Sequence, residues 1–324
     1  MQEKTLTGGR SYYLDIARTI AIISISLNHA VNRTYDNYFG QMEEFLESSY
    51  LSSLLKSVVT VFSHLGVPLF LMISGALLLH KRMETADDVK RFYRHNLLEL
   101  FITAEIWYFI MYWFIFFEDI STGYWEEGLA GTLLGCVKTM LFLDQITMGS
   151  MWYMPMILCL YTTIPFAAML VKKLSLKALS LPLLLAFLYG MCLPALNSLL
   201  VLLFALICGY QLYAYSDWVD YLVDYDFPLL LLCAMGLLEL LRRGAEHLRG
   251  LRPVVTYLAK ISFGVYFIHI LIMSLLEWNV NFDGWARSLK LLFLEGVSVG
   301  GSILLIALFS GIPFCRRRMF GIKG

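Results

Sequence analysis

The chain has 324 residues, of which 59% are hydrophobic and only 15% carry a charged side chain. Soluble proteins carry charge on roughly a quarter of their residues, so this composition excludes an ordinary soluble protein and indicates a polytopic membrane protein. The 25 basic and 25 acidic residues cancel to a net charge of zero. Since no long basic block lies outside the C-terminal end, nucleic acid is not an expected partner.

The six cysteines form no recognisable motif. They lie mostly inside apolar runs, and no two of them are spaced as Cys-x-x-Cys. Disulfide frameworks and zinc sites depend on such spacings, so we expect packing thiols and no metal ion.

Apolar segments long enough to cross a membrane recur along the chain. A transmembrane helix needs about 20 mainly apolar residues. Nine segments are candidates, with approximate bounds 12–31, 54–80, 96–117, 150–171, 176–194, 196–215, 226–241, 253–276 and 288–314. Another stretch, 130–143, is too short and too interrupted to count. Because the loops are short, we predict an all-α transmembrane helix bundle that forms a single domain over residues 1–324.

The distribution of Lys and Arg predicts the orientation, because basic loops resist translocation. Lys4 and Arg10 place the N-terminus in the cytoplasm, and later basic and acidic loops alternate accordingly. The basic tail at 316–318 reaches the cytoplasm only after an even number of crossings. We therefore expect a tenth span near 211–226. Several aspartates interrupt that stretch, so it either re-enters the bundle or is the remnant of a lost helix.

Ionisable side chains within the predicted spans are functional candidates, because each costs on the order of 2.5–3.5 kcal/mol at membrane depth. Arg18 and His29 in the first span are eleven residues apart. At about 100° and 1.5 Å per residue they share one helix face and lie about 16 Å apart along the axis. Asp15 is one turn before Arg18 and can pair with it. Taken singly, a snorkelling arginine and a buried structural histidine stay open as alternatives.

Two arginines one turn apart precede the third span. Arg91 and Arg94 indicate a phosphate site at the cytoplasmic end of the third span, because guanidinium groups bind phosphate oxygens through paired hydrogen bonds. Basic residues also gather at cytoplasmic helix ends without any ligand. Glu105 follows Arg94 at the same eleven-residue spacing.

Other ionisable and aromatic residues form a second tier of candidates. His64 lies in the second span, and His269 and Glu295 lie in the last two. Trp152 and Tyr153 open the fourth span, where aromatic side chains also serve as ordinary interfacial anchors.

These pieces, in this order, resemble the acyltransferase-3 family of integral membrane O-acyltransferases. The resemblance rests on Arg18-x10-His29, on the glycine-bounded run 66–75 with sequence Gly-Val-Pro-Leu-Phe-Leu-Met-Ile-Ser-Gly, and on Arg91-x-x-Arg94. The runs 151–155 and 262–269, which end in Pro155 and His269, look like the fourth and ninth helices of the family.

The resemblance implies an O-acetyltransferase that moves an acetyl or other short acyl group from acetyl-CoA to a hydroxyl of an envelope or exocellular polysaccharide. Arg91 and Arg94 would hold the CoA phosphates, and His29 would act as general base or carry the acetyl group. Arg18 would stabilise the thioester oxyanion or orient the donor. Glu105 and His269 would orient the base or bind the acceptor.

The expected partners are a carbohydrate or lipid-linked glycan acceptor and membrane lipid, and the oligomeric state is undetermined. The expected location is a bacterial inner membrane with both termini in the cytoplasm. Two alternatives remain from the sequence. One is a glycolipid carrier or flippase, in which the same charges would bind a moving substrate. The other is a non-catalytic relative that serves as an assembly partner.

Overall fold

The computed structural model describes residues 11–35, 50–123, 128–144, 151–173, 203–209 and 228–322. Every regular element in these ranges is a helix, as the apolar runs predict. The chain divides into two compact units. The first unit comprises Met1–Gly75, Pro182–Ser262 and Ala286–Glu295, and the second comprises Ala76–Leu181, Phe263–Trp285 and Gly296–Gly324.

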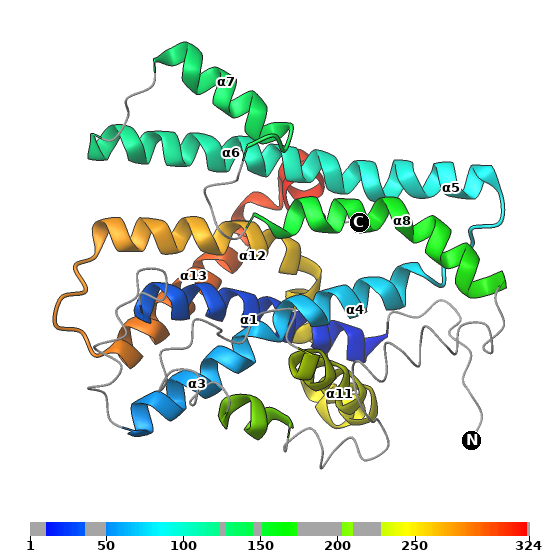
Figure 1. Cartoon of the computed structure of the whole chain (residues 1–324), viewed down its shortest axis with the longest axis horizontal. Coiled ribbons are helices and arrows are strands. Elements are labelled where there is room, and N and C mark those ends of the chain that lie inside the picture. The colour runs from blue at the N-terminus through cyan, green and yellow to red at the C-terminus, as the bar shows by residue number, and fades with distance from the viewer. Residues whose placement is uncertain are drawn as a thin grey trace. The chain divides into compact units, whose positions relative to one another are not determined.

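The first unit is built around α1, which packs on α3 and α11 (Figure 1). Its helices are α1 (Tyr12–Tyr35), α3 (Tyr50–His64), most of α4 (Gly66–Leu78), a short helix at 203–209, α11 (Pro228–Gly244), the 3₁₀-helix η2 (Ala245–Leu251), and the N-terminal parts of α12 (Arg252–Asn279) and α13 (Arg287–Phe309). The core of this unit is apolar and comes from five helices.

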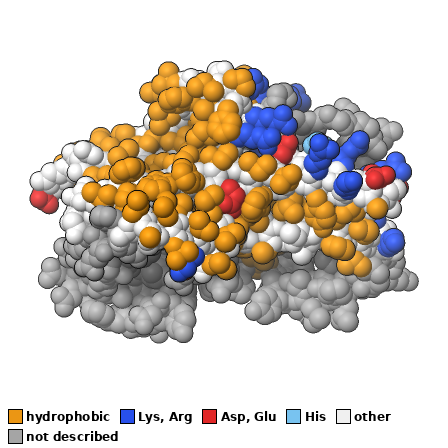
Figure 2. Space-filling view, turned by 90° about the horizontal axis from the view of Figure 1, so that it is seen from above, with side chains coloured by type: hydrophobic (Ala, Val, Ile, Leu, Met, Phe, Trp, Pro, Cys, Tyr) orange, Lys and Arg blue, Asp and Glu red, His pale blue; other side chains and the backbone are white. Residues whose placement is uncertain are grey.

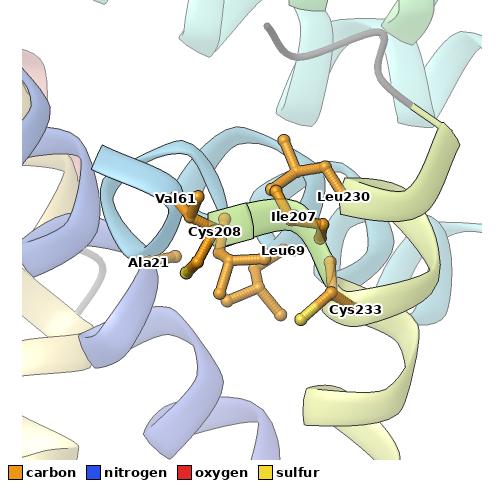
Figure 3. Packing of buried hydrophobic residues seen from close by; sticks show 9 residues of the cluster. Ala21, Val61, Leu69, Ile207, Cys208, Leu230 and Cys233 are labelled. Carbon is orange, nitrogen blue, oxygen red and sulfur yellow. The ribbon is translucent and has the colours of Figure 1, made fainter. Parts of the chain in front are cut away.

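Figure 3 shows this core at close range. Its buried members are Ala21, Val61, Leu65, Leu69, Ile207, Cys208, Leu230, Cys233 and Ala234. Burial of apolar area stabilises such a cluster by about 25 cal/mol per Å². Cys208 and Cys233 are both free and buried, which confirms the packing role expected for these two thiols.

The predicted second span is broken into two helices. α3 ends at His64, a turn follows at Leu65, and α4 begins at Gly66. Proline has no backbone N–H, so Pro68 cannot donate the helical bond to the carbonyl of His64. The break therefore follows from the sequence around Pro68.

The second unit contains a long helix that changes its hydrogen-bonding pattern. In Figure 1, α5 (Ala86–Phe92) runs through the π-helix η1 (Tyr93–Leu97) into α6 (Leu98–Thr122). The other helices of this unit are α7 (Leu129–Met140), α8 (Tyr153–Lys173), the π-helix η3 (Cys315–Met319) and the C-terminal parts of α12 and α13.

Local side-chain bonds determine where α5 begins. Thr85 caps the helix, because its hydroxyl accepts from the N–H of Asp88 while the Asp88 carboxylate accepts from the N–H of Thr85. This reciprocal pair is a capping box, which satisfies two donors that a helix start otherwise leaves exposed.

Six helical stretches are long and apolar enough to cross a membrane. They are Tyr12–Tyr35, Lys56–Leu78, Ala86–Thr122, Tyr153–Lys173, Leu229–Asn279 and Arg287–Phe309. On the face seen in Figure 2, hydrophobic side chains cover much of the described surface, and Lys and Arg side chains gather in a few groups. A surface of this kind suits a lipid environment.

The predicted count of nine or ten spans is not confirmed. The predicted spans 226–241 and 253–276 form one helical stretch, since η2 joins α11 to α12 without a gap. The predicted spans 176–194 and 196–215 and the expected tenth near 211–226 lie outside the described residues, apart from 203–209. The short stretch 130–143 corresponds to the 12-residue helix α7.

Candidate functional site

The central candidates Arg18 and His29 lie on the uninterrupted helix α1. Because no break separates them, the eleven-residue spacing places them on one face with an axial separation of about 16 Å. Both side chains are half-buried, whereas most of their neighbours on α1 are fully buried. Between them on this face, Ile22 and Ile25 are buried apolar side chains.

The start of α1 is fixed to the start of α12. Asp15 is 4% exposed, and its Oδ2 lies 3.4 Å from the hydroxyl of Thr256. The hydroxyl of Thr19 lies 2.9 Å from the carbonyl oxygen of Asp15 and 3.2 Å from that of Val255. These contacts anchor the helix one turn away from Arg18. Direct pairing of Asp15 with Arg18 stays a prediction.

A carboxyl group bonds to a residue that lies one helical turn from His29. Ser26 is fully buried, and its hydroxyl donates to Oε2 of Glu295 on α13 over 2.8 Å. Ser26 and His29 are three residues apart and are therefore neighbours on the surface of α1. Sequence reasoning found Glu295 as an intramembrane acid but gave it no role, because periodicity alone does not say which helix it faces.

A second imidazole and a polar cluster lie on α3, which packs against α1. The hydroxyl of Ser63 lies 3.2 Å from Oδ1 of Asn28, the residue next to His29. Nδ1 of His64 lies 2.8 Å from the carbonyl oxygen of Thr60. Since a carbonyl can only accept, Nδ1 of His64 is the donor in this bond.

In the second unit, Arg91 and Arg94 are exposed at the junction between α5 and η1. The two residues between them attach the helix to the rest of the unit. Phe92 is 2% exposed, and the hydroxyl of Tyr93 donates to the carbonyl of Thr162 on α8 over 2.9 Å. The two guanidinium groups are thus presented to solvent by a firmly packed helix. π-helical turns of this kind occur frequently at functional sites.

Glu105 lies on α6 at an apolar cavity. The cavity has a volume of about 340 Å³ and is lined by Phe101, Ile102, Glu105, Ile106, Phe109, Ile110 and Met140. Oε1 of Glu105 is buried and has no hydrogen-bond partner among the described residues. The cavity is lined by side chains of α6 and α7, both in the second unit.

The other candidates of the second unit differ in exposure. Trp152 is 43% exposed and Tyr153 is 8% exposed, and the ring of Tyr153 lies 5.9 Å from that of Tyr266. His269 is fully buried, and its Nδ1 lies 2.8 Å from the carbonyl oxygen of Val265. Full burial of this ring favours a packing or positioning role.

The candidates are divided between the two units. Asp15, Arg18 and His29 belong to the first unit, and Arg91, Arg94, Glu105, Trp152, Tyr153 and His269 belong to the second. Within the described ranges, no group of three or more His, Cys, Asp or Glu side chains is placed to hold a metal ion.

Comparison with known families gives one match. A family model described as an acyltransferase domain, that of the acyltransferase-3 family, matches residues 11–198 and 193–310. This range covers most of both units and all of the candidate residues. No curated protein and no solved structure matches the chain.

Proposed function

Because the chain belongs to the acyltransferase-3 family, we propose that it is a membrane O-acyltransferase that moves an acetyl or other short acyl group from cytosolic acyl-CoA to a hydroxyl of an envelope or exocellular polysaccharide. The supporting observation is the single helix α1 that carries Arg18 and His29 on one face. An arrangement about 16 Å long can guide a thin acyl-pantetheine arm from one side of the membrane toward the acceptor on the other.

The donor site is assigned to the junction of α5 and η1. CoA carries several phosphate charges, and the exposed guanidinium groups of Arg91 and Arg94 provide paired donors for their oxygens. The capping box at Thr85 and the burial of Phe92 fix the helix that presents them. Little backbone freedom is therefore lost when the donor binds.

His29 is assigned as the general base. Its imidazole removes the proton of the acceptor hydroxyl as the oxygen attacks the thioester carbonyl carbon. The carbon–sulfur bond then breaks, the new ester forms, and the CoA thiolate leaves and takes up the proton from the imidazolium. An imidazole suits both proton transfers because it titrates near neutral pH.

Glu295 is assigned as a positioning residue for this base. Its carboxyl group bonds to Ser26, which lies one helical turn from His29, and a negative charge near the base stabilises the imidazolium that forms during attack. Ser26 in turn keeps the carboxyl group of Glu295 oriented through its hydroxyl.

Arg18 is assigned to donor orientation. Side chains on a helix lean toward its N-terminus, so the guanidinium group of Arg18 extends away from His29. An oxyanion donor has to lie about 3 Å from the reacting oxygen. A role in guiding the CoA arm therefore fits its place on α1 better than contact with the thioester oxygen.

The proposal is tested with the purified full-length protein in liposomes, supplied with radiolabelled acetyl-CoA and a pool of envelope glycans. We expect labelled glycan with the wild type and none with His29→Ala, while CoA binding is retained. His247→Ala, which changes an exposed histidine of η2, is the matched control and should keep full activity. Residual transfer above a few per cent in His29→Ala would remove it as the base. Absence of both labelling and CoA binding in the wild type would refute the proposed function.

We also propose a bacterial inner-membrane location with both termini in the cytoplasm. The basic residues near both ends of the chain support this orientation. A reporter fused after Gly324 should be active only in the cytoplasm, and an external reporter would mean an odd number of crossings.

A further inference from the structure

The chain turns back into the second unit after α13. This helix ends at Phe309, and the π-helix η3 that follows lies beside α6, where it is drawn in red in Figure 1. The residues after η3 are buried, since Phe320 is 3% exposed and Ile322 is 7% exposed. Residues 315–322, which we call the return segment, are therefore packed within the unit.

Contacts with α6 hold the return segment in place. Nε1 of Trp107 donates to the carbonyl of Met319 over 2.8 Å. Nη2 of Arg317 lies 3.3 Å from Oε1 of Glu99. An ion pair with a side chain this exposed contributes little to stability, so the buried side chains and the indole bond provide most of the attachment. The ion pair instead shows where the arginines of η3 lie.

The return segment attaches close to the arginines assigned to the donor. Arg91 and Arg94 are three residues apart and are neighbours on the helix surface. Glu99 follows Arg94 by five residues, which is about one turn across η1, because hydrogen bonds in a π-helix join residues five apart. Arg317 thus pairs with a residue about one turn beyond Arg94, toward the membrane-spanning part of α6.

The other arginines of η3 are available to a ligand. Arg316 is exposed and Arg318 is half-buried. Among the described residues, neither guanidinium group has an ion-pair or hydrogen-bond partner, and the same is true of Arg91 and Arg94. Basic residues are common at cytoplasmic helix ends, but that preference does not require them to be packed against a neighbouring helix. Positive charges held together on a fixed surface attract anions.

We propose that Arg316 and Arg318 bind the pyrophosphate of the acyl-CoA donor, while Arg91 and Arg94 bind its 3′-phosphate. CoA carries these two phosphate groups at separate places, and the pyrophosphate is the one joined to the pantetheine arm. Because the arm has to reach into the membrane-spanning part of the unit, the pyrophosphate belongs farther along α6 than the 3′-phosphate. The arginines of η3 lie at that end of the series. This inference deepens the proposed function and rests on it for the identity of the donor.

Binding can be measured without any acyl transfer. The full-length protein in dodecyl maltoside is titrated calorimetrically with CoA and with dephospho-CoA, which lacks the 3′-phosphate. The double variant Arg316→Gln with Arg318→Gln should weaken the binding of both ligands at least about tenfold. The double variant Arg91→Gln with Arg94→Gln should weaken CoA binding by a similar factor and dephospho-CoA binding by much less. Arg249→Gln, which changes an exposed arginine paired in η2, is the matched control and should bind like the wild type.

Two results would overturn the inference. One is equal CoA affinity in the wild type and in the double variant of η3. The other is a loss of affinity in that variant for CoA but not for dephospho-CoA, since this would place the 3′-phosphate at η3. If the double variant unfolds, Arg316→Gln and Arg318→Gln are titrated singly. Each should weaken CoA binding about threefold, and unchanged affinity in both contradicts the inference.

The headgroup of an anionic lipid is the other source of phosphate at this place. The titrations are therefore repeated in nanodiscs of phosphatidylcholine with and without phosphatidylglycerol, and the loss of CoA affinity should be the same in both. A double variant of η3 that binds CoA like the wild type but binds less phosphatidylglycerol would mean a lipid headgroup site and would overturn the inference alone. If CoA binding depends on η3 but no acetyl group is transferred to any glycan, the proposed function fails and the CoA site stands. A wild type that binds neither CoA nor dephospho-CoA refutes both.

Discussion

Adding a methyl group at Gly66 would test how closely α4 approaches α1. A Cβ atom at this position would lie 2.7 Å from the carbonyl oxygen of Ala21 and 2.7 Å from Cγ1 of Ile25. The carbonyl oxygen belongs to the backbone of α1, so it cannot move aside as a flexible side chain can. Gly66→Ala should therefore push the two helices apart between Arg18 and His29.

The expected cost follows from two opposing terms. Overpacking a close contact costs about 1–3 kcal/mol. Replacing glycine by alanine gains at most about 1 kcal/mol inside a helix, and less at a first helical residue such as this one. The net destabilisation is about 1–2 kcal/mol, which lowers the melting temperature by about 2–8 °C if each kcal/mol shifts it by about 2–4 °C.

The assay compares thermal unfolding of Gly66→Ala and Gly296→Ala in the same detergent. At Gly296, inside α13, nothing lies within 4 Å of an added Cβ, so alanine should leave the melting temperature unchanged or raise it. Acyl transfer by Gly66→Ala should also fall, because the face that carries His29 is displaced. A melting temperature equal to that of the wild type would refute the close approach of α4 to α1.

Three further substitutions test the site and its supports. The double change Arg91→Gln with Arg94→Gln should raise the Kd for CoA at least about tenfold at low salt and less at high salt. Equal Kd values for the wild type and the double variant by calorimetry would leave these arginines a role in membrane topology only. Tyr93→Phe removes a bond to a backbone carbonyl of α8 and should cost about 0.5–1.5 kcal/mol in thermal or denaturant unfolding, whereas no loss would show that the bond contributes nothing. Ser26→Ala removes the donor to Glu295 and should lower kcat more than it changes the KM for acetyl-CoA, and an unaltered kcat would contradict the positioning role.

The sequence predicts those features of the molecule that depend on one segment at a time. Apolar length identifies α1, α6, α8 and α13 as spanning helices, and the 3.6-residue period places Arg18 and His29 on one face. The break at Leu65 inside the predicted span 54–80 was not predicted, although Pro68 explains it.

Contacts between distant segments could not be predicted in this way. Ser26 and Glu295 are separated by 269 residues, and periodicity defines the faces of two helices without saying which faces meet. The approach of Lys56 and Arg287 to the ring of Tyr35 was missed for the same reason, because the three residues come from different helices. The continuity of α11 with α12 was also missed, because the charged residues of η2 indicated a loop between two separate spans.

The π-helix η1 has a consequence for how the α5–α6 segment tolerates changes in length. The N–H of Leu98 bonds to the carbonyl of Tyr93, five residues back, so this turn holds one residue more than an α-helical turn. Deleting His95 would let the turn close as a regular α-helix while both flanks keep their facing directions. Deleting a residue within α6 would instead rotate every later side chain by about 100° relative to Arg91. The extra residue can therefore absorb a one-residue deletion, so that Arg91 and the apolar face of α6 keep their relative directions.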